Sequence, residues 1–296
     1  MHISKRPADR IMASLQIILH AVFIAAIIYW YYFGFHTLSW VLAGIFTIGG
    51  GLGVTLAYHR MLTHKSFICT NIYVRRTLIY FGGLLQNAPS WVRNHMAHHA
   101  YTDTRHDPHS PYWPYNGGFK GFWWSHMFWL NRKYLPPSRI LYNPELNDRD
   151  IQWEHRWHKV FVASGFLIPF LIGGLYGLTV NGVQGFFLYG LDSFLLAGII
   201  RTTASLHITF SINSFGHMLG WKARKHNDPF FIQDSSRTNP ALAALSFGEG
   251  NHGDHHLYER SARIGLLDFS WPVILLFERM GIFINVKRPP WMIVRK

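Results

Sequence analysis

Apolar residues are concentrated in four long stretches of the chain, and polar residues gather between and after them. The stretches cover residues 13–33, 38–58, 160–180 and 183–208. Each has roughly the 20 mostly apolar residues that a transmembrane helix needs. Short turns, at residues 34–37 and at Asn181 and Gly182, join the stretches in pairs. The pattern therefore predicts two helical hairpins that cross a membrane.

The two remaining long segments, 59–159 and 213–296, are polar and basic. Of the 28 Lys and Arg residues, only Arg201 lies inside an apolar stretch, and the short turns contain none. Because segments rich in Lys and Arg stay on the cytoplasmic side of a membrane, we expect both termini and both polar segments to face the cytoplasm. The predicted fold is all-α: a single polytopic membrane domain over residues 1–296, with four transmembrane helices and a cytosolic helical cap.

The composition agrees with a membrane protein. Hydrophobic residues make up 49% of the chain, and charged residues only 15%, against about 25% charged in an ordinary soluble domain. This excludes a disordered chain and argues against a soluble enzyme. The net charge of +13 suits nucleic acid, acidic partners or a membrane surface, and the apolar bias favours the membrane, so we expect no nucleic-acid partner. The single cysteine, Cys69, excludes an intrachain disulfide.

Eight of the 19 histidines fall into three short motifs in the polar segments. HRMLTH contains His59 and His64, HMAHH contains His95, His98 and His99, and HGDHH contains His252, His255 and His256. On a helix, residues three and four apart share a face, so each HxxHH motif is expected to present its three imidazoles in one direction. His59 and His64 would diverge by about 140° on an α-helix. They would then serve different metals, or the helix would end between them.

Imidazole is a ligand for zinc, copper, iron and nickel. A single structural zinc takes four ligands, so eight clustered histidines suggest two metals held in the cap. The alternative from another class of protein is a metal store or transporter. A transporter would carry its ligands along a path through the membrane, whereas most of these histidines lie outside the apolar stretches.

Together these motifs resemble those of the membrane fatty acid desaturases, in particular the acyl-CoA delta-nine (stearoyl-CoA desaturase) type with three histidine boxes. The similarity includes GVTLAYHRMLTHKSF, HHAYTDTRHDPHSP, GFWWSHMFWL, NSFGH and SFGEGNHGDHH, and it covers roughly Leu38 to Ser270 in order. Two positions depart from the usual pattern: Met96 stands where many relatives have Arg, and Gly253 where many have Asn. Neither departure removes a histidine.

The resemblance implies a metal site and a reaction. The implied metal ligands are His59, His64, His95, His98, His99, His217, His252, His255 and His256, with Asn213 acting through a water. They would hold two iron ions (Fe2+/Fe3+), with dioxygen as co-substrate. The implied activity is insertion of a cis double bond into a saturated fatty acyl chain. A hydroxylase or acetylenase of the same superfamily is the nearest alternative, because the same oxidant can support either reaction.

Acidic residues near the motifs are candidates to hold the second nitrogen of the ligand histidines, because metal-bound histidines usually donate that N–H to a carboxylate or carbonyl. The candidates are Asp103, Asp107, Glu249 and Asp254. Some of these acids could instead cap helices or be solvated.

The remaining predictions concern substrate and partners. In the family, the second span closes the far end of the acyl tunnel, which points to Ala43 and Thr47; Trp91 would line the mouth or anchor at the membrane interface. Arg75, Arg76 and Arg93 are candidates for binding the head group of a fatty acyl thioester or acyl lipid. We expect membrane lipids around the spans. We also expect a separate electron donor, a ferredoxin or a b-type cytochrome with its reductase, because only 40 residues follow His256.

Overall fold

The computed structural model describes residues 7–131, 136–222 and 234–293. Within them, the chain is mostly helical. Three helical runs are long and apolar enough to cross a membrane: Ala13–Phe33, Thr37–Thr63 and Arg149–Met218. The first belongs to α1 (Pro7–Phe33). The second joins α2 (Thr37–Leu52) to a π-helix, η1 (Gly53–Thr63). Residues 1–6, which we expect on the cytoplasmic side, lie outside the described part of the chain.

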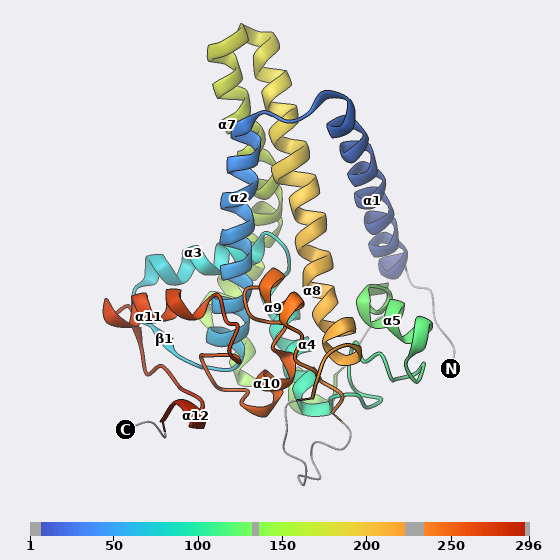
Figure 1. Cartoon of the computed structure of the whole chain (residues 1–296), viewed down its shortest axis with the longest axis vertical. Helices are drawn as coiled ribbons and strands as arrows, with labels where there is room; N and C mark the ends of the chain where they lie inside the picture. The colour runs from blue at the N-terminus through green and yellow to red at the C-terminus, as the bar shows by residue number, and fades with distance from the viewer. Residues whose placement is uncertain (1–6, 132–135, 223–233, 294–296) are drawn as a thin grey trace.

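The third run turns back on itself. It consists of α7 (Arg149–Ser193), the π-helix η4 (Phe194–Ile200) and α8 (Arg201–Met218). The backbone leaves helical geometry at Asn181 and Gly182, where Gly182 has a φ of +61°, and the two arms of the hairpin lie side by side (Figure 1). The predicted turn at these two residues is therefore confirmed. The last two of the four predicted stretches occupy the two arms of one helical run.

Small residues let the two arms approach closely. A Cβ atom on Gly177 would lie 2.1 Å from the carbonyl oxygen of Gly185, and one on Gly173 would lie 2.3 Å from Ser193 Oγ. No larger side chain fits at these positions without moving the arms apart. Glycine at helix contacts is typical of membrane proteins, where close backbone packing replaces the hydrophobic effect as the driving force.

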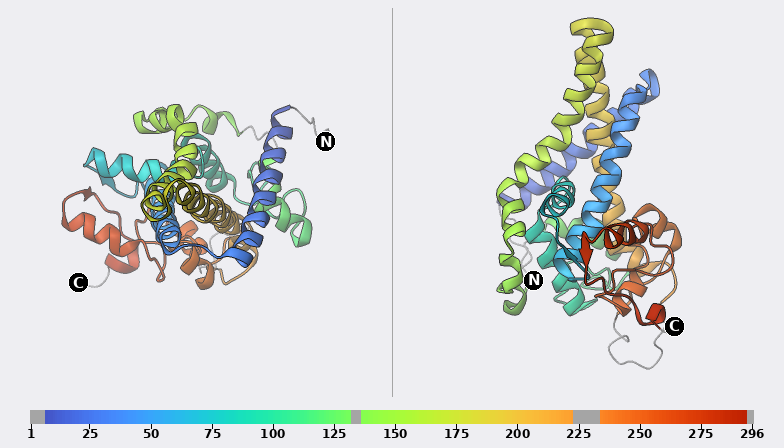
Figure 2. Two further views of the ribbon diagram at one scale, coloured as in Figure 1. Left: turned by 90° about the horizontal axis from the view of Figure 1, so that it is seen from above. Right: turned by 90° about the vertical axis from the view of Figure 1, so that its left-hand side faces the viewer.

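The shorter elements gather at one end of the long helices, where they form the cap (Figures 1 and 2). In chain order they are β1 (Ile68–Cys69), α3 (Ile72–Gly83), α4 (Ala88–Tyr101), α5 (Gly118–His126), η2 (Phe128–Asn131), α6 (Ser138–Leu141), η3 (Pro144–Asn147), α9 (Pro240–Leu245), α10 (His252–Leu257), α11 (Trp271–Arg279), β2 (Phe283–Ile284) and α12 (Pro290–Ile293). The strands β1 and β2 form one short antiparallel pair, the only sheet among the described residues.

Local sequence sets where several cap helices begin. The side chain of Asn71 accepts hydrogen bonds from the backbone N–H groups of residues 73 and 74 at the start of α3. Asp148 does the same for α7, and Asn239 for α9. Asn and Asp are favoured at this position because they satisfy N–H groups that have no partner within the helix.

The π-helix η1 lies at the centre of the cap core. Its apolar residues Leu56, Tyr58 and Leu62 are fully buried and pack in one cluster with Ile79 of α3, Val92 of α4, Ile274 of α11 and Phe283 of β2. This packing fixes the helix that carries the first histidine motif. It also joins the two polar segments of the chain into a single cap.

Candidate metal centre

Five histidines from three elements meet in one cluster. His59 and His64 come from the end of η1, His95 and His99 from α4, and His255 from α10. The Nε2 atoms of His59 and His255 are 2.9 Å apart, as are those of His64 and His95. His255 Nε2 also lies 2.9 Å from His99 Nε2. We call this group the five-histidine cluster.

His59 and His64 meet because the helix that carries them is wound as a π-helix. Their ring centroids are 4.9 Å apart, and the backbone N–H of His64 donates to the carbonyl of His59, five residues earlier. One turn of a π-helix joins residues i and i+5. The expected divergence of 140° assumed α-helical winding and was wrong for this reason. Both histidines belong to one cluster, and the π-helical winding continues up to His64.

Four histidines form a second cluster beside the first. His98 comes from α4, His217 from α8, and His252 and His256 from α10. His217 Nε2 lies 3.0 Å from His252 Nε2 and 3.3 Å from His98 Nε2, and His98 Nε2 lies 3.2 Å from His256 Nε2. All four side chains are buried. We call this group the four-histidine cluster.

Each HxxHH motif is divided between the two clusters, and the expectation that its three rings point one way was wrong. His95 and His99 of α4 face the five-histidine cluster, whereas His98 faces the other; in α10, His255 joins the first cluster while His252 and His256 join the second. The side chains leave the helix over a wide arc. The two helices therefore lie between two binding centres.

Carboxylates lie against the second ring nitrogen of five of these histidines. The contacts to Nδ1 are His98–Asp107 at 3.0 Å, His217–Asp103 at 3.2 Å, His256–Asp234 at 2.8 Å, His59–Glu249 at 2.5 Å and His99–Glu259 at 3.4 Å. Asp107, Asp103 and Asp234 accept the hydrogen of Nδ1–H. Each ring then presents the lone pair of Nε2 to the centre of the cluster, as a metal ligand must. The contacts of Glu249 and Glu259 are close approaches of a carboxylate to the ring without a hydrogen bond to Nδ1.

Three of the four predicted acids, Asp103, Asp107 and Glu249, thus lie against cluster histidines. Asp254 does not: among the described residues, its carboxylate accepts a hydrogen bond from Thr238 at 3.1 Å. Asp234 and Glu259, which contact His256 and His99, were missed. Asp234 precedes His256 by 22 residues and Glu259 follows His99 by 160 residues, so no local sequence pattern marks them.

The donor set fits two transition-metal ions. His95 Nε2 lies within hydrogen-bonding distance of both His64 Nε2 and His99 Nε2, at 2.9 and 3.1 Å. A neutral imidazole nitrogen has either one hydrogen or one lone pair. His95 Nε2 therefore cannot form a full hydrogen bond with both neighbouring nitrogens at once, whereas all three nitrogens can direct their lone pairs at one shared cation. Nine imidazoles in groups of five and four are suitable for iron, zinc, copper or nickel.

Burial keeps most of these rings in the form that binds metal. Burial, assisted by neighbouring imidazoles, lowers the pKa of His64, His95, His252, His255 and His256 well below its usual value. They are therefore neutral at pH 7, as metal ligation requires.

The acids beside the clusters carry negative charge at neutral pH. Burial raises the pKa of Asp107, but only to about 6. Burial also acts to raise the pKa of Asp103, but the charge and hydrogen bond of His217 outweigh it and hold that pKa at about 2. These carboxylates would offset the positive charge of bound metal ions, which nine neutral imidazoles leave uncompensated.

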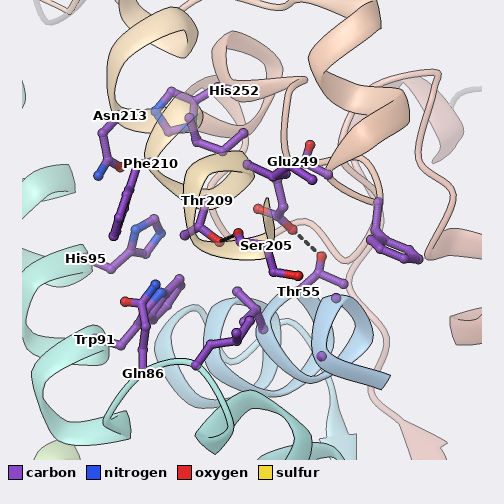
Figure 3. Close-up of a pocket in the computed structure, with 18 of the residues that line it drawn as sticks. Thr55, Gln86, Trp91, His95, Ser205, Thr209, Phe210, Asn213, Glu249 and His252 are labelled. Carbon is purple, nitrogen blue, oxygen red and sulfur yellow. Dashed lines mark hydrogen bonds between the residues drawn. The ribbon is translucent and has the colours of Figure 1, made fainter. Parts of the chain in front are cut away.

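A largely apolar cavity extends from the clusters between α2 and α8 (Figure 3). Its walls include Thr47, Gly50, Gly51 and Val54 from the α2–η1 helix, and Ser205, Ile208, Thr209 and Ile212 from α8. His95, His98, His252 and Asn213 line the end at the clusters, together with Trp91. Thr55 of the wall donates a hydrogen bond to Glu249, which also contacts His59. The cavity therefore leads directly to the metal ligands.

The predicted tunnel residues lie in two different places. Thr47 and Trp91 line the cavity. Ala43 instead packs in a small cluster with Leu42, Leu196 and Ala197, between α2 and η4. Ala43 is thus buried at a contact between two helices.

Two of the three predicted head-group arginines are engaged elsewhere in the cap. Arg75 pairs with Asp148 at 3.2 Å and also with Asp150. Arg76 lies 3.5 Å from Asp150 and its guanidinium stacks over Trp153. These contacts join α3 to the beginning of α7. Arg93 is half-buried on α4.

Comparison with known proteins identifies the family to which this sequence belongs. The family model for fatty acid desaturases matches residues 35–263. The chain belongs to the fatty acid desaturase family. It is an oxidoreductase that acts on fatty acyl groups, and all nine histidines of the two clusters lie inside the matched region.

Several curated desaturases are similar over most of their length. The chain is 34% identical to delta-9 acyl-lipid desaturase 2 of Arabidopsis thaliana, covering 96% of this chain and 84% of the relative. It is 34% identical to an acyl-CoA C20 delta5-desaturase of Anemone leveillei, covering 87% and 76%. It is 32% identical to a hex-5-enoyl-[acyl-carrier protein] acetylenase of Moorena producens (strain JHB), covering 80% and 73%.

Proposed function

We propose that the chain is a di-iron, dioxygen-dependent desaturase that inserts a cis double bond of the delta-nine type into a saturated acyl chain. The observation that carries the proposal is the junction of the two histidine clusters with an apolar cavity. The delta-nine assignment is supported by the acyl-lipid relative from Arabidopsis thaliana. Two bound irons would supply the oxidant for unactivated C–H bonds, by reduction of dioxygen with electrons from a donor.

The protein's own residues prepare the site for this chemistry. The nine Nε2 atoms would hold the irons, and the carboxylates on Nδ1 keep the rings oriented. The cavity walls would hold the acyl chain extended past the clusters and exclude water from it. Gly50 and Gly51 line the cavity on α2, and Gly51 lets Phe247 pack against this wall, because a Cβ there would lie 2.2 Å from the ring. Asn213, which lines the cavity without belonging to either cluster, would hold a water at one iron.

The membrane arrangement follows from the same helices. We propose four crossings, by α1, by α2 with the first part of η1, and by the two arms of the hairpin of α7, η4 and α8. The cap and the metal centre would then lie on the cytoplasmic side, as the distribution of Lys and Arg indicates. An acyl chain could enter the cavity from the bilayer end while its head group remains at the cap.

The carrier of the acyl chain and the electron donor are left open by the relatives' names, which include acyl-lipid and acyl-CoA desaturases. We propose a fatty acyl thioester or acyl lipid as substrate, and a ferredoxin or b-type cytochrome with its reductase as donor. A surface depression lined by His256, Arg260, Lys287 and Arg288 supports an acidic donor. It places basic side chains next to a ligand histidine, so an electron would have a short path to the four-histidine cluster.

The test is expression in a cell that lacks its own desaturase and is supplied with saturated fatty acids of several lengths. Mass spectrometry of the acyl products should find chains that have lost two hydrogens. His98→Ala and His255→Ala each remove a ligand from a different cluster, and each should abolish the product and lower the iron content. His155→Gln, a change at an exposed histidine outside the clusters, is the matched control and should retain both.

The same assay distinguishes the alternative reactions. An acetylenase, favoured by the similarity to the Moorena producens enzyme, would convert an enoyl chain supplied to the cell into an alkyne and leave saturated chains unchanged. A hydroxylase would add one oxygen. If saturated chains gained no double bond while the protein held iron, the desaturase proposal would be wrong.

A further inference from the structure

Three histidines outside both clusters form a hydrogen-bonded chain across the molecule. His126 Nδ1 lies 3.0 Å from Ser214 Oγ, and His126 Nε2 lies 2.9 Å from His207 Nδ1. His207 Nε2 lies 2.9 Å from His20 Nε2, and His20 Nδ1 lies 2.6 Å from the carbonyl oxygen of Gln16. We call this series, from Ser214 to Gln16, the histidine chain. It joins α5, α8 and α1.

The position of the rings argues for a function. His20 lies within the apolar run Ala13–Phe33, and His207 within the run that ends at Met218. Ionisable residues inside a membrane are costly to place there and usually mark a pathway for ions or protons. A metal site does not account for them. His126 and His207 each direct their two nitrogens to two different neighbours, so the three rings lie in a line and do not converge on one point.

The number of hydrogens in the histidine chain can change by one. Four hydrogen bonds link its five groups, and the Gln16 carbonyl can only accept. If Ser214 donates its hydroxyl hydrogen to His126, three neutral rings supply the other three hydrogens. Ser214 also has a second acceptor, the carbonyl of Phe210 at 3.2 Å. When its hydroxyl turns there, the rings must supply four hydrogens, one more than three neutral imidazoles carry. Rotation of one hydroxyl group therefore couples to uptake or release of one proton.

The two ends of the histidine chain lie where a proton would be needed and where it could enter. Ser214 is fully buried and follows Asn213, which lines the cavity at the clusters. At the other end, Gln16, His20 and His207 line a neighbouring cavity of about 480 Å³, whose wall also includes Asn87 and His158 at the cap. The cavity has room for water, which needs only about 10–15 Å³ by this kind of measure. Gln16, His20, Asn87 and His158 offer it polar partners among walls that are mostly apolar.

We propose that the histidine chain conducts protons from this water-accessible cavity to the metal centre. The proposal rests on the proposed function, because desaturation consumes protons: R–CH2–CH2–R′ + O2 + 2 e− + 2 H+ gives R–CH=CH–R′ + 2 H2O. The substrate provides two hydrogens, the one-electron donor provides two electrons, and the remaining two protons come from solvent. A proton arriving at one nitrogen of a ring is matched by release from the other nitrogen to the next ring. Burial, with the neighbouring His207, lowers the pKa of His126 to about 4, so this ring would pass a proton on and not retain it.

The first test compares His126→Gln and His207→Gln with the control His155→Gln. Glutamine can replace a hydrogen bond but has no nitrogen that takes up a proton near pH 7. Iron content should remain at the wild-type level, while turnover should fall about 100-fold, the lower range for loss of a positioned proton-transfer group. Turnover of both variants should slow further in D2O, by a larger factor than in the wild type. Wild-type turnover in both variants, or a slow variant with an unchanged isotope effect, would overturn the proton pathway.

A second measurement needs no turnover and separates this proposal from the proposed function. In zinc-filled protein labelled with ¹⁵N-histidine, His126→Gln should shift the ring signals of both His207 and His20, whereas His155→Gln should shift neither. An unchanged His20 signal would show that the rings are not linked. A wild-type protein that holds two metals but makes no double bond would contradict the proposed function, whatever the ring signals show. Normal desaturation by His207→Gln would contradict only the proton pathway.

Discussion

At the scale of single residues, the metal centre depends on the contacts of Nδ1, the histidine nitrogen that would face away from a bound metal. Nδ1 contacts with Asp103, Asp107 and Asp234 orient the rings of the four-histidine cluster. In contrast, Asp254 lies in the same motif as His252 and His255 but contacts Thr238. Proximity in sequence to a ligand is therefore a poor guide to which acid supports it.

Asp107→Asn should weaken metal binding about 10- to 100-fold, the usual effect of losing a carboxylate that holds a ligand histidine. Asp107 is buried, and it lies 3.0 Å from His98 Nδ1. Asp254→Asn is the matched control and should change metal affinity by less than about 3-fold, since no ligand histidine depends on it. Metal retained after titration with a chelator measures both. Equal losses in the two variants would contradict this assignment.

Bulk at Thr47 should shorten the acyl chain that the enzyme accepts. Thr47 lines the cavity and lies twelve residues before His59, about 18 Å along the helix at 1.5 Å per residue. Thr47→Trp should therefore block long tails and shift the preference toward shorter chains, while the double bond keeps its distance from the head group. Ile48→Trp introduces the same side chain at a neighbouring exposed position and should leave the preference unchanged. Product analysis over a series of saturated chains distinguishes them; the same preference in both variants would exclude Thr47 from the tunnel.

At the scale of elements, the change from α- to π-helical winding at the end of α2 brings two ligands together. It places His59 and His64, five residues apart, on one side of η1. Packing against α3 supports this segment: a Cβ on Gly53 would lie 2.3 Å from the backbone nitrogen of Gly82 and 2.7 Å from the carbonyl oxygen of Leu78. The position of the first histidine motif thus depends on a contact between two backbones.

Gly53→Ala should destabilise the protein by about 1–3 kcal/mol, the usual cost of overpacking, and should lower its iron content, because η1 must move away from α3. Gly44→Ala on the same helical run is the control. Its Cβ would have no atom within 4 Å, so alanine should be neutral or stabilising by about 0.5–1 kcal/mol. Thermal unfolding in detergent and metal analysis compare the two. A Gly53→Ala protein as stable and iron-rich as the wild type would show that the contact is not restrictive.

At the scale of the whole molecule, two hairpins bring all nine ligands to one end. The long helices turn back at residues 34–36 and at Asn181 and Gly182, so the segments that carry the histidine motifs emerge together (Figure 2). The cap then closes over them through the core around η1. The long helices and the candidate metal centre thus share one packed core.

Cysteine labelling should place the two ends of the long helices on opposite sides of the membrane. Cys69 is the only cysteine, and Cys69→Ala provides a background without thiols. Asn181→Cys, at the tip of the hairpin, should react with a membrane-impermeant maleimide in intact cells. Arg279→Cys, exposed on α11 of the cap, should react only after the membrane is opened. Reaction of both positions in intact cells would contradict a cytoplasmic cap.

The long helices, the metal ligands and the family could be predicted from the sequence. The four apolar stretches and the turn at Asn181 and Gly182 predicted the long helices, because a membrane-crossing helix requires a continuous apolar run. The histidine motifs predicted metal ligands and the family, since few other chemistries require so many imidazoles at such spacings.

The tertiary structure decided how the histidines are distributed between the two clusters. Local spacing predicted one direction for each HxxHH motif, but each motif divides between two clusters. The cause is that α4 and α10 each lie between two groups of partner histidines from other elements. Likewise, the π-helical winding of η1, the acids Asp234 and Glu259, and the histidine chain all depend on contacts between segments far apart in sequence. No periodicity within one segment encodes such contacts, because their energy arises only when the segments pack together.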